Sequence, residues 1–455
     1  MKQNFLTTSL CIAVLALTSN TVSAETIQSA AKYALEKNPE VQAQWYNFVE
    51  SVSNQKVARA GYLPSVDFTA AYGTGDRDFD DSSWRKQGEA EISLTQVLFD
   101  GFRMQSKVKQ GDYAALKSYY ELNDSVERKA LEASQAYLDV IRFRKLVALA
   151  QTNVNHHQHT FDQIQQRANQ GVGNRADLSQ AAGRVSLAQT NLMTEQANLI
   201  DTESRYLRLV GKASEKELAP VELDASIPDS LNGVLKASYE NNKALLAALS
   251  DTEYARATAQ EAKSTLYPKL SFIAKTGVYQ NRNSFKEDID PRSYGQDSVV
   301  ELRLNYNLFN GGADRAAYKA ATARVMKADD LKQKACIDIR QSVSVAYNNV
   351  NNLSNQMEWL QRHRDESAAV VKAYTDQFDI GRRSLLDVLD AENEAFQSDR
   401  AYSSAQYDLM SAQLQVLYYV GQLLPVLGVQ RDNLPSLDEV SNRELNAAGL
   451  CTAQS

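Results

Sequence analysis

The chain contains an internal duplication, and this repeat limits its possible folds more than any other feature. "LFDG" at 98–101 returns as "LFNG" at 308–311, an offset of 210 positions. Other pairs at the same offset are Gly171 with Gly381, Asp177 with Asp387, and Gly211 with Gly421. Nearer the N-terminus the offset is 204, which indicates a longer loop in the second half. The sequence therefore predicts two copies of one structural unit.

The start of the chain has the pattern of a secretory signal. Lys2 is followed by the apolar run "LCIAVLAL" and then by Val22, Ser23 and Ala24, small residues that suit cleavage. After this segment no run of 18 apolar residues follows, so the sequence offers no membrane-spanning helix. The predicted division is a signal peptide at 1–24, a first repeat at 25–211, a linker at 212–230, a second repeat at 231–424 and a tail at 425–455.

Each repeat contains two stretches whose hydrophobicity alternates with period two. In "VVELRLNYNLF" at 299–309, apolar side chains alternate with Glu, Arg and Asn, which is typical of a strand with one apolar face. The expected strands lie at about 65–74, 89–99, 269–280 and 298–309. About 9 to 11 residues suffice for a tilted strand to cross an outer membrane. The smallest known membrane barrels need about eight strands, so several chains must contribute to one barrel.

Between the strand pairs, the placement of proline permits very long helices. None of the eight prolines falls within 65–219 or 292–424. The stretch from Phe102 to Gln170 could form roughly 100 Å of helix at about 1.5 Å per residue. Glycines then interrupt the pattern, so we expect long helical hairpins with tips near 171–176 and 381–386.

Composition and motifs argue against several classes of function. A net charge of −7 with 43% hydrophobic residues indicates neither disorder nor a nucleic-acid surface. The sequence contains no phosphate-binding glycine loop, no nucleophile elbow and no HExxH motif. We therefore expect no enzymatic activity and no cofactor, so that the energy for any transport must come from a partner.

Two clusters of polar residues could suggest metal sites. His156, His157 and His159 lie in "NHHQH", but no carboxylate or cysteine stands at ligand spacing, which favours a solvated helix face. The acidic stretch at 76–81 lacks the ordered glycine and terminal glutamate of a calcium loop. We expect a solvated loop there, and no metal at either place.

Several short segments resemble the TolC-like outer membrane efflux and secretion ducts. The segments that carry the resemblance are "GYLPSVDF", "LYPKLSF", "LFDG", "LFNG", "GVGNRADL" and "GRRSLLDVLDA", and they extend over nearly all of the mature chain. Within this family, "RANQGVGNRADLSQAAGR" and "SRYLRLVG" are most similar to the branch that serves type I secretion of large adhesins and agglutination proteins.

The resemblance implies a mixed α+β membrane protein in the outer membrane of a Gram-negative bacterium. Three copies would form a homotrimer with a twelve-stranded β-barrel in outer membrane lipid, a mixed equatorial region and a long periplasmic α-helical barrel. A periplasmic adaptor would dock at the hairpin tips, at Gly171, Gly173 and Gly381. The leading function is protein export with an inner-membrane ABC transporter. The alternatives are small-molecule efflux with a proton-driven pump and a periplasmic coiled-coil scaffold, which leaves the amphipathic strands unexplained.

The resemblance also assigns roles to particular residues. Asp387 and Asp390 would point into the pore near its periplasmic entrance, although Asp387 could instead only favour the first turn of its helix. Asp177 and Arg383, with Arg382 as a second candidate, would form a latch that holds the entrance closed. The family folds its tail against the helices near mid-height, which makes a disulfide between Cys336 and Cys451 a hypothesis for an oxidising periplasm.

Overall fold

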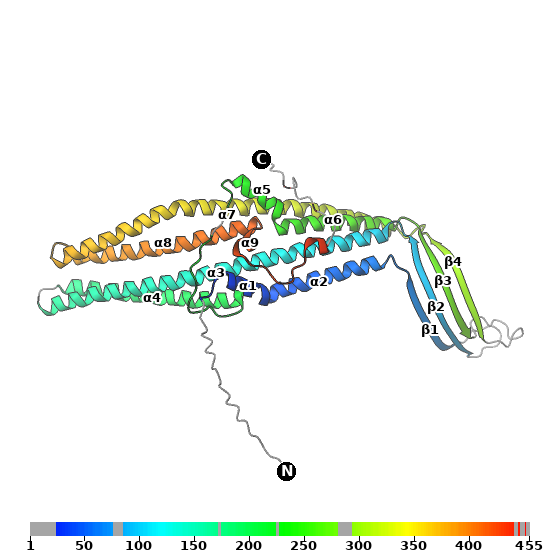
Figure 1. Ribbon diagram of the computed structural model, residues 1–455, viewed down its shortest axis with the longest axis horizontal. Helices are drawn as coiled ribbons and strands as arrows, with labels where there is room; N and C mark the ends of the chain where they lie inside the picture. Colours follow the sequence, from blue (N-terminus) through cyan, green and yellow to red (C-terminus); the bar gives the residue numbers. More distant parts are fainter. Residues whose placement is uncertain are drawn as a thin grey trace, which may run out of the picture.

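A computed structural model describes residues 24–75, 85–171, 174–223, 227–280, 294–440, 445 and 451. The predicted signal peptide lies outside these residues except for Ala24, as does the acidic stretch at 76–81. The molecule is strongly elongated, with a sheet at one end and the tips of two helical hairpins at the other (Figure 1). None of the helices in the described part of the chain is long and apolar enough to cross a membrane.

The two halves repeat the same order of two helices, two strands and two helices. The first half contains α1 (Ile27–Lys37), α2 (Pro39–Ala60), β1 (Ser65–Gly75), β2 (Arg85–Phe99), α3 (Arg103–Asn169) and α4 (Arg175–Val210). The second contains α5 (Leu231–Asn241), α6 (Lys243–Ser264), β3 (Lys269–Gln280), β4 (Tyr294–Asn305), α7 (Ala313–Asp379) and α8 (Leu385–Tyr419). The short helices α9 (Leu423–Leu427) and α10 (Leu437–Val440) follow in the tail.

The four strands form one antiparallel sheet in the order β1-β2-β3-β4. Val66, Leu94, Ala274 and Val300 lie in one row across the sheet, and the next row on the opposite face contains Asp67, Ser93, Lys275 and Val299. Val66 and Val300 are 65% and 73% exposed. The sheet therefore has an exposed face rich in apolar side chains, which no other described part of the chain covers, as period-two alternation predicts.

Two of the expected strand boundaries were wrong. The strand expected at 89–99 begins at Arg85, because its first residues pair with the end of β1, with Gly75 opposite Arg85. The strand expected at 298–309 covers Tyr294–Asn305 instead. Asn305 pairs with Lys269, the first residue of β3, so the residues after Asn305 have no strand opposite them.

Helices α3 and α7 contain 67 residues each, about 100 Å at 1.5 Å per residue. Helices α2 and α4 together accompany α3 along its length, and α6 and α8 accompany α7 (Figure 1). The junctions repeat as well. Asn38 and Asn242 each end one helix and cap the next with the side-chain oxygen, which accepts a hydrogen bond from the backbone amide of Glu40 or Leu245.

The largest core lies near mid-length, where α1, the linker and the tail pack on α3, α4 and α8. Tyr137 of α3 is fully buried there, and its hydroxyl donates to the backbone carbonyls of Glu25 and Ala219, at 2.6 and 2.9 Å. Tail residues such as Leu427 and Val429 belong to the same core. The segment around Glu25 and the start of the tail therefore pack together at this level and hold the middle of α3 in place.

Candidate functional site: the tips of the helical hairpins

The two hairpin tips lie side by side at one end of the molecule (Figure 1). The turns occupy 170–174 and 380–384, slightly tighter than expected. Gly171 and Gly381 have φ angles of +77° and +73°, a left-handed conformation that ends a helix readily only at glycine. Both are exposed at the tip, whereas Gly173 lies outside the described residues.

An apolar cluster joins the two hairpins just above these turns. Phe378 of α7 and Leu389 of α8 pack with Ile164 of α3 and Ala181 of α4. Leu385 and Val388 of α8 are buried in the same cluster. The tips are therefore held together inside one chain by hydrophobic contact, and the charged residues lie around this contact.

Asp387 is part of the cap that starts α8. The Ser384 hydroxyl donates to the Asp387 carboxylate at 2.8 Å, and the Asp387 backbone amide donates to Ser384 Oγ. The hydrogen bond from the Ser384 side chain lowers the pKa of the Asp387 carboxyl, and the nearby Arg383 guanidinium, 3.7 Å away, adds to this. The structure thus confirms that Asp387 stabilises the first turn of α8, and the orientation of its carboxylate toward a pore stays a prediction.

Asp390 makes a contact that sequence reasoning missed. Its carboxylate lies 2.6 Å from Arg184 of α4, and its side chain is 58% exposed. The ion pair connects α8 with the other hairpin one turn above Asp387. Asp387 and Asp390 are therefore both close to an arginine, which reduces the negative charge that they present to their surroundings.

The structure does not bring Asp177 and Arg383 together within one chain. Arg383 donates to the Gln377 side chain at 3.1 Å, and its guanidinium lies over the ring of Tyr374, 4.1 Å from the centroid. Asp177 and the exposed Arg382 have no side-chain hydrogen bond or ion pair to any residue that the structure describes. Both are thus available to a neighbouring molecule.

The solvated helix face expected for the histidine cluster is confirmed for His156 and His159, which share one side of α3. His156 and His159 are exposed, but His157 is only 3% exposed and faces Glu392 of α8. Neighbouring residues of a helix point in different directions, and α3 is covered on the side that carries His157. No group of three or more potential ligands for a metal occurs among the described residues.

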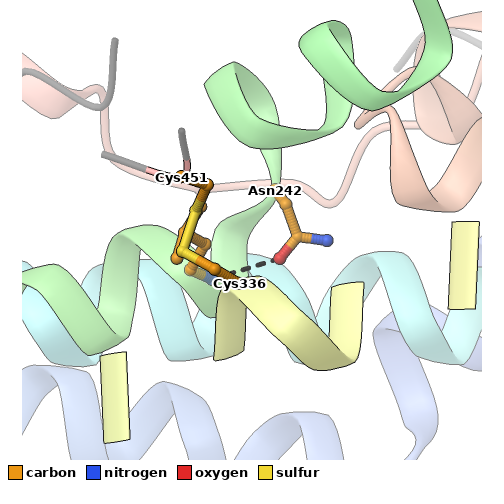
Figure 2. Close-up of a disulfide and its surroundings, with 4 residues drawn as sticks. Asn242, Cys336 and Cys451 are labelled. Carbon is orange, nitrogen blue, oxygen red and sulfur yellow. Dashed lines mark hydrogen bonds between the residues drawn. A yellow bond between two sulfur atoms is a disulfide. The ribbon is translucent and has the colours of Figure 1, made fainter. Parts of the chain in front are cut away.

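Cys336 and Cys451 form a disulfide in the structure, with Cα atoms 5.6 Å apart. The bond attaches the tail to α7 beside Asn242, at the start of α6 (Figure 2). Both sulfur-bearing side chains pack against a second core that contains Val234, Leu245 and Val343. The bond thus joins the tail to the second half, far from the hairpin tips.

The comparisons with known proteins agree with this architecture. The family model described as "Outer membrane efflux protein" matches residues 30–212 and 234–422. The outer membrane protein TolC of Salmonella enteritidis is 24% identical, over 88% of this chain and 82% of the relative. The alkaline protease secretion protein AprF of Pseudomonas aeruginosa is 25% identical, over 86% of this chain and 83% of the relative.

A solved structure shows the same fold. The outer membrane protein VceC of Vibrio cholerae superposes with a TM-score of 0.75 at 15% identity, covering 87% of this chain and 96% of that one. Proteins of this family are channels and not enzymes, and they act as homotrimers with periplasmic adaptors and inner-membrane transporters. The resemblance to TolC-like ducts is confirmed. The chain belongs to the outer membrane efflux protein family, and it is the subunit of a TolC-like outer membrane channel with a large periplasmic helical part.

Proposed function

We propose that three copies of this chain form the exit duct of a type I secretion system, which carries a large adhesin-like protein across the periplasm and the outer membrane. The observation that carries this proposal is the open sheet, in which β1 and β4 each have a partner strand on one side only within the described residues. Joining β4 of one copy to β1 of the next removes these edges. The long hairpins then continue the barrel away from the membrane.

The choice of protein export rests on sequence. One relative of similar length is named for the secretion of alkaline protease. The turn segments of this chain also resemble those of ducts that export adhesins and agglutination proteins. The partners in this proposal are a periplasmic adaptor at the hairpin tips and an inner-membrane ABC transporter, which supplies the energy.

A second candidate is the outer membrane component of a proton-driven multidrug efflux pump, which the description of the family as efflux proteins favours. Deletion of the gene distinguishes the two. Under the first proposal, a large protein disappears from the culture medium and the cell surface while drug sensitivity stays unchanged. Under the second, the minimal inhibitory concentrations of several drugs fall and the secreted proteins stay the same. An ABC transporter that copurifies with the cross-linked channel supports the first.

We further propose that Asp387 and Asp390 of three copies form an acidic ring at the periplasmic entrance, which favours cations. Single-channel recording of Asp387→Asn/Asp390→Asn tests this, because asparagine keeps an oxygen that can cap α8. We expect weaker cation selectivity and weaker block by divalent ions. Ser384→Ala is the matched control, since it weakens the cap and keeps both carboxylates. Equal changes in both variants overturn the proposal.

Asp177 and Arg382 then become candidates for a latch between copies, since each lacks a side-chain partner among the described residues of its own chain. Arg383 is held by Gln377 and Tyr374, so its removal also disturbs its own hairpin. An exposed ion pair contributes only about 0 to 1 kcal/mol, which suits a link that adaptor docking releases. We expect higher conductance in Arg382→Ser and Arg383→Ser, and unchanged conductance in both refutes the latch.

A further inference from the structure

The contact between α3 and α8 contains a buried polar layer, which we call the α3–α8 seam and define by His157, Thr160 and Glu392. Toward the tips the neighbouring layer is apolar and contains Ile164 and Leu389. On the other side Ala150, Leu192 and Phe396 form another apolar cluster. A charged residue between two apolar layers is costly unless its partner compensates for the lost hydration. The seam is therefore a place where a change of charge alters the contact between the hairpins.

The geometry of the seam holds the Glu392 carboxylate from two sides. Glu392 Oε2 lies 3.0 Å from His157 Nδ1, and Thr160 Oγ1 donates to Glu392 Oε1 at 3.2 Å. The side chains of His157 and Glu392 are 4% and 9% exposed. His157 Nδ1 and Glu392 Oε2 are close but not aligned as a hydrogen bond, and neither has another hydrogen-bond partner among the described residues. Attraction between opposite charges, which depends little on angle, is thus the main interaction available to this pair.

Among the residues that the structure describes, His157 is the only basic side chain within ion-pair distance of Glu392. On α4, Arg184 pairs with Asp390. On the other side of α8, the exposed Glu394 pairs with His363 of α7. Among the described residues, no lysine or arginine forms an ion pair with Glu392, and the other histidines of the cluster are exposed. His157 is therefore the side chain of the seam that can place a positive charge next to Glu392.

We propose that His157 and Glu392 form a pH-sensitive link that holds the α7–α8 hairpin against the α3–α4 hairpin and restrains the opening of the duct. The inference rests on the proposed function in assuming that opening separates the hairpins. Histidine changes charge between about pH 5 and 8. With His157 protonated, attraction between the two buried opposite charges holds the hairpins together. At higher pH, the hydrogen bond from Thr160 is the only one of these two interactions that Glu392 keeps. The two hairpins then separate more easily.

The test is the open probability of the full trimer in planar bilayers between pH 8 and 5.5. We expect the open probability of the wild type to fall roughly tenfold or more on acidification, as expected for a buried ion pair that forms only at low pH. His157→Gln and Glu392→Gln should remove this dependence, and the double variant should add nothing to either. His156→Gln is the matched control: this histidine is one residue away and exposed, so the pH profile should keep the wild-type shape.

Hydrogen exchange at pH 6 and 8, corrected for the intrinsic rates, gives a second measurement that needs no channel activity. Residues 385–400 of α8 should be better protected at pH 6 in the wild type, and equally protected at both values in Glu392→Gln. If the wild type conducts but its pH response equals that of His157→Gln, the link is refuted. The proposed function as a duct is not affected by this outcome. A wild type without any channel refutes the proposed function, while exchange still decides whether the link exists.

Discussion

Helices α3 and α7 occupy matching places in the two repeats and have the same length, yet 24 residues of α3 are buried and only seven of α7. The difference comes from position in the subunit. Helix α3 lies between α2, α4, α6 and α8, and α1 and the tail cover its middle (Figure 1). Helix α7 lies at the edge, so its outer apolar side chains are not covered by any described part of the chain. Duplicated sequences thus form the same element, but their neighbours decide how each is stabilised.

The largest effect is expected on the uncovered face of α7. Met326, Ile337 and Trp359 are 57 to 64% exposed, and their spacing places them on one side of the helix. Burial of such a face against a second copy is the main driving force for association. Ile337→Asp/Trp359→Asp should therefore abolish the trimer and leave the monomer helical, as measured by light scattering and circular dichroism. Gln151→Asp, on the exposed side of α3, is the control, and a trimer that persists in Ile337→Asp/Trp359→Asp places the interface elsewhere.

The disulfide supplies α7 with a covalent attachment where the matching residue of α3, Val126, is simply buried. The bond closes a loop across a sequence separation of 115, which in the chain-entropy account stabilises the fold by about 4 to 5 kcal/mol. Cys336→Ser/Cys451→Ser should lower the free energy of unfolding in detergent by up to this amount. Reduction of the wild type should produce the same loss, and a stability that neither treatment changes shows that packing alone holds the tail.

Glu127 of α3 is a buried carboxyl group, whereas the matching residue in α7, Ile337, is exposed. The comparison shows that burial of α3 also has a cost in stability. Burial raises the pKa of Glu127 from 4.5 to about 7, against the attraction of Lys243. Between these values the unfolded chain has lost the proton that the folded chain keeps, so stability falls as the pH rises. The loss should reach about 3 kcal/mol above pH 7. In Glu127→Gln, the free energy of unfolding from denaturant titrations should no longer fall by this amount between pH 4.5 and 7. An unchanged pH profile would falsify the assignment of this loss to Glu127.

Tyr137 and Tyr347 are matching residues that give the smallest and cleanest comparison. The buried Tyr137 hydroxyl donates to two backbone carbonyls, whereas that of Tyr347 donates to the exposed carbonyl of Asp229. Tyr137→Phe leaves the half-buried Ala219 carbonyl without its partner, while the Glu25 carbonyl keeps the hydrogen bond from the Ala219 amide, so the cost should be about 1 kcal/mol. In Tyr347→Phe, water can take the place of the hydroxyl at the exposed Asp229 carbonyl. The loss of stability should therefore be only a few tenths of the loss in Tyr137→Phe. Thermal unfolding of both variants gives the answer, and equal costs contradict the burial argument.

Much of the candidate site was predictable because local signals encode it. Gly171 and Gly381 were found as tips since a left-handed turn favours glycine, and the polar residue before each second helix provides its cap. Contacts between the hairpins were not predictable in the same way. The pairs Arg184–Asp390 and His157–Glu392 join residues more than 200 positions apart, and no spacing within one helix indicates which side chains meet there.

The sequence by itself determined the elements of this protein: the duplication, the four amphipathic strands and the long helices, which follow from period-two alternation and from tracts without proline. The tertiary structure decided which side chains are covered. A periodic pattern shows that a helix has an apolar face but not which neighbour covers it, and α3 and α7 differ for this reason. The same packing placed His157 against Glu392, between two apolar layers, where a charge is little screened by water.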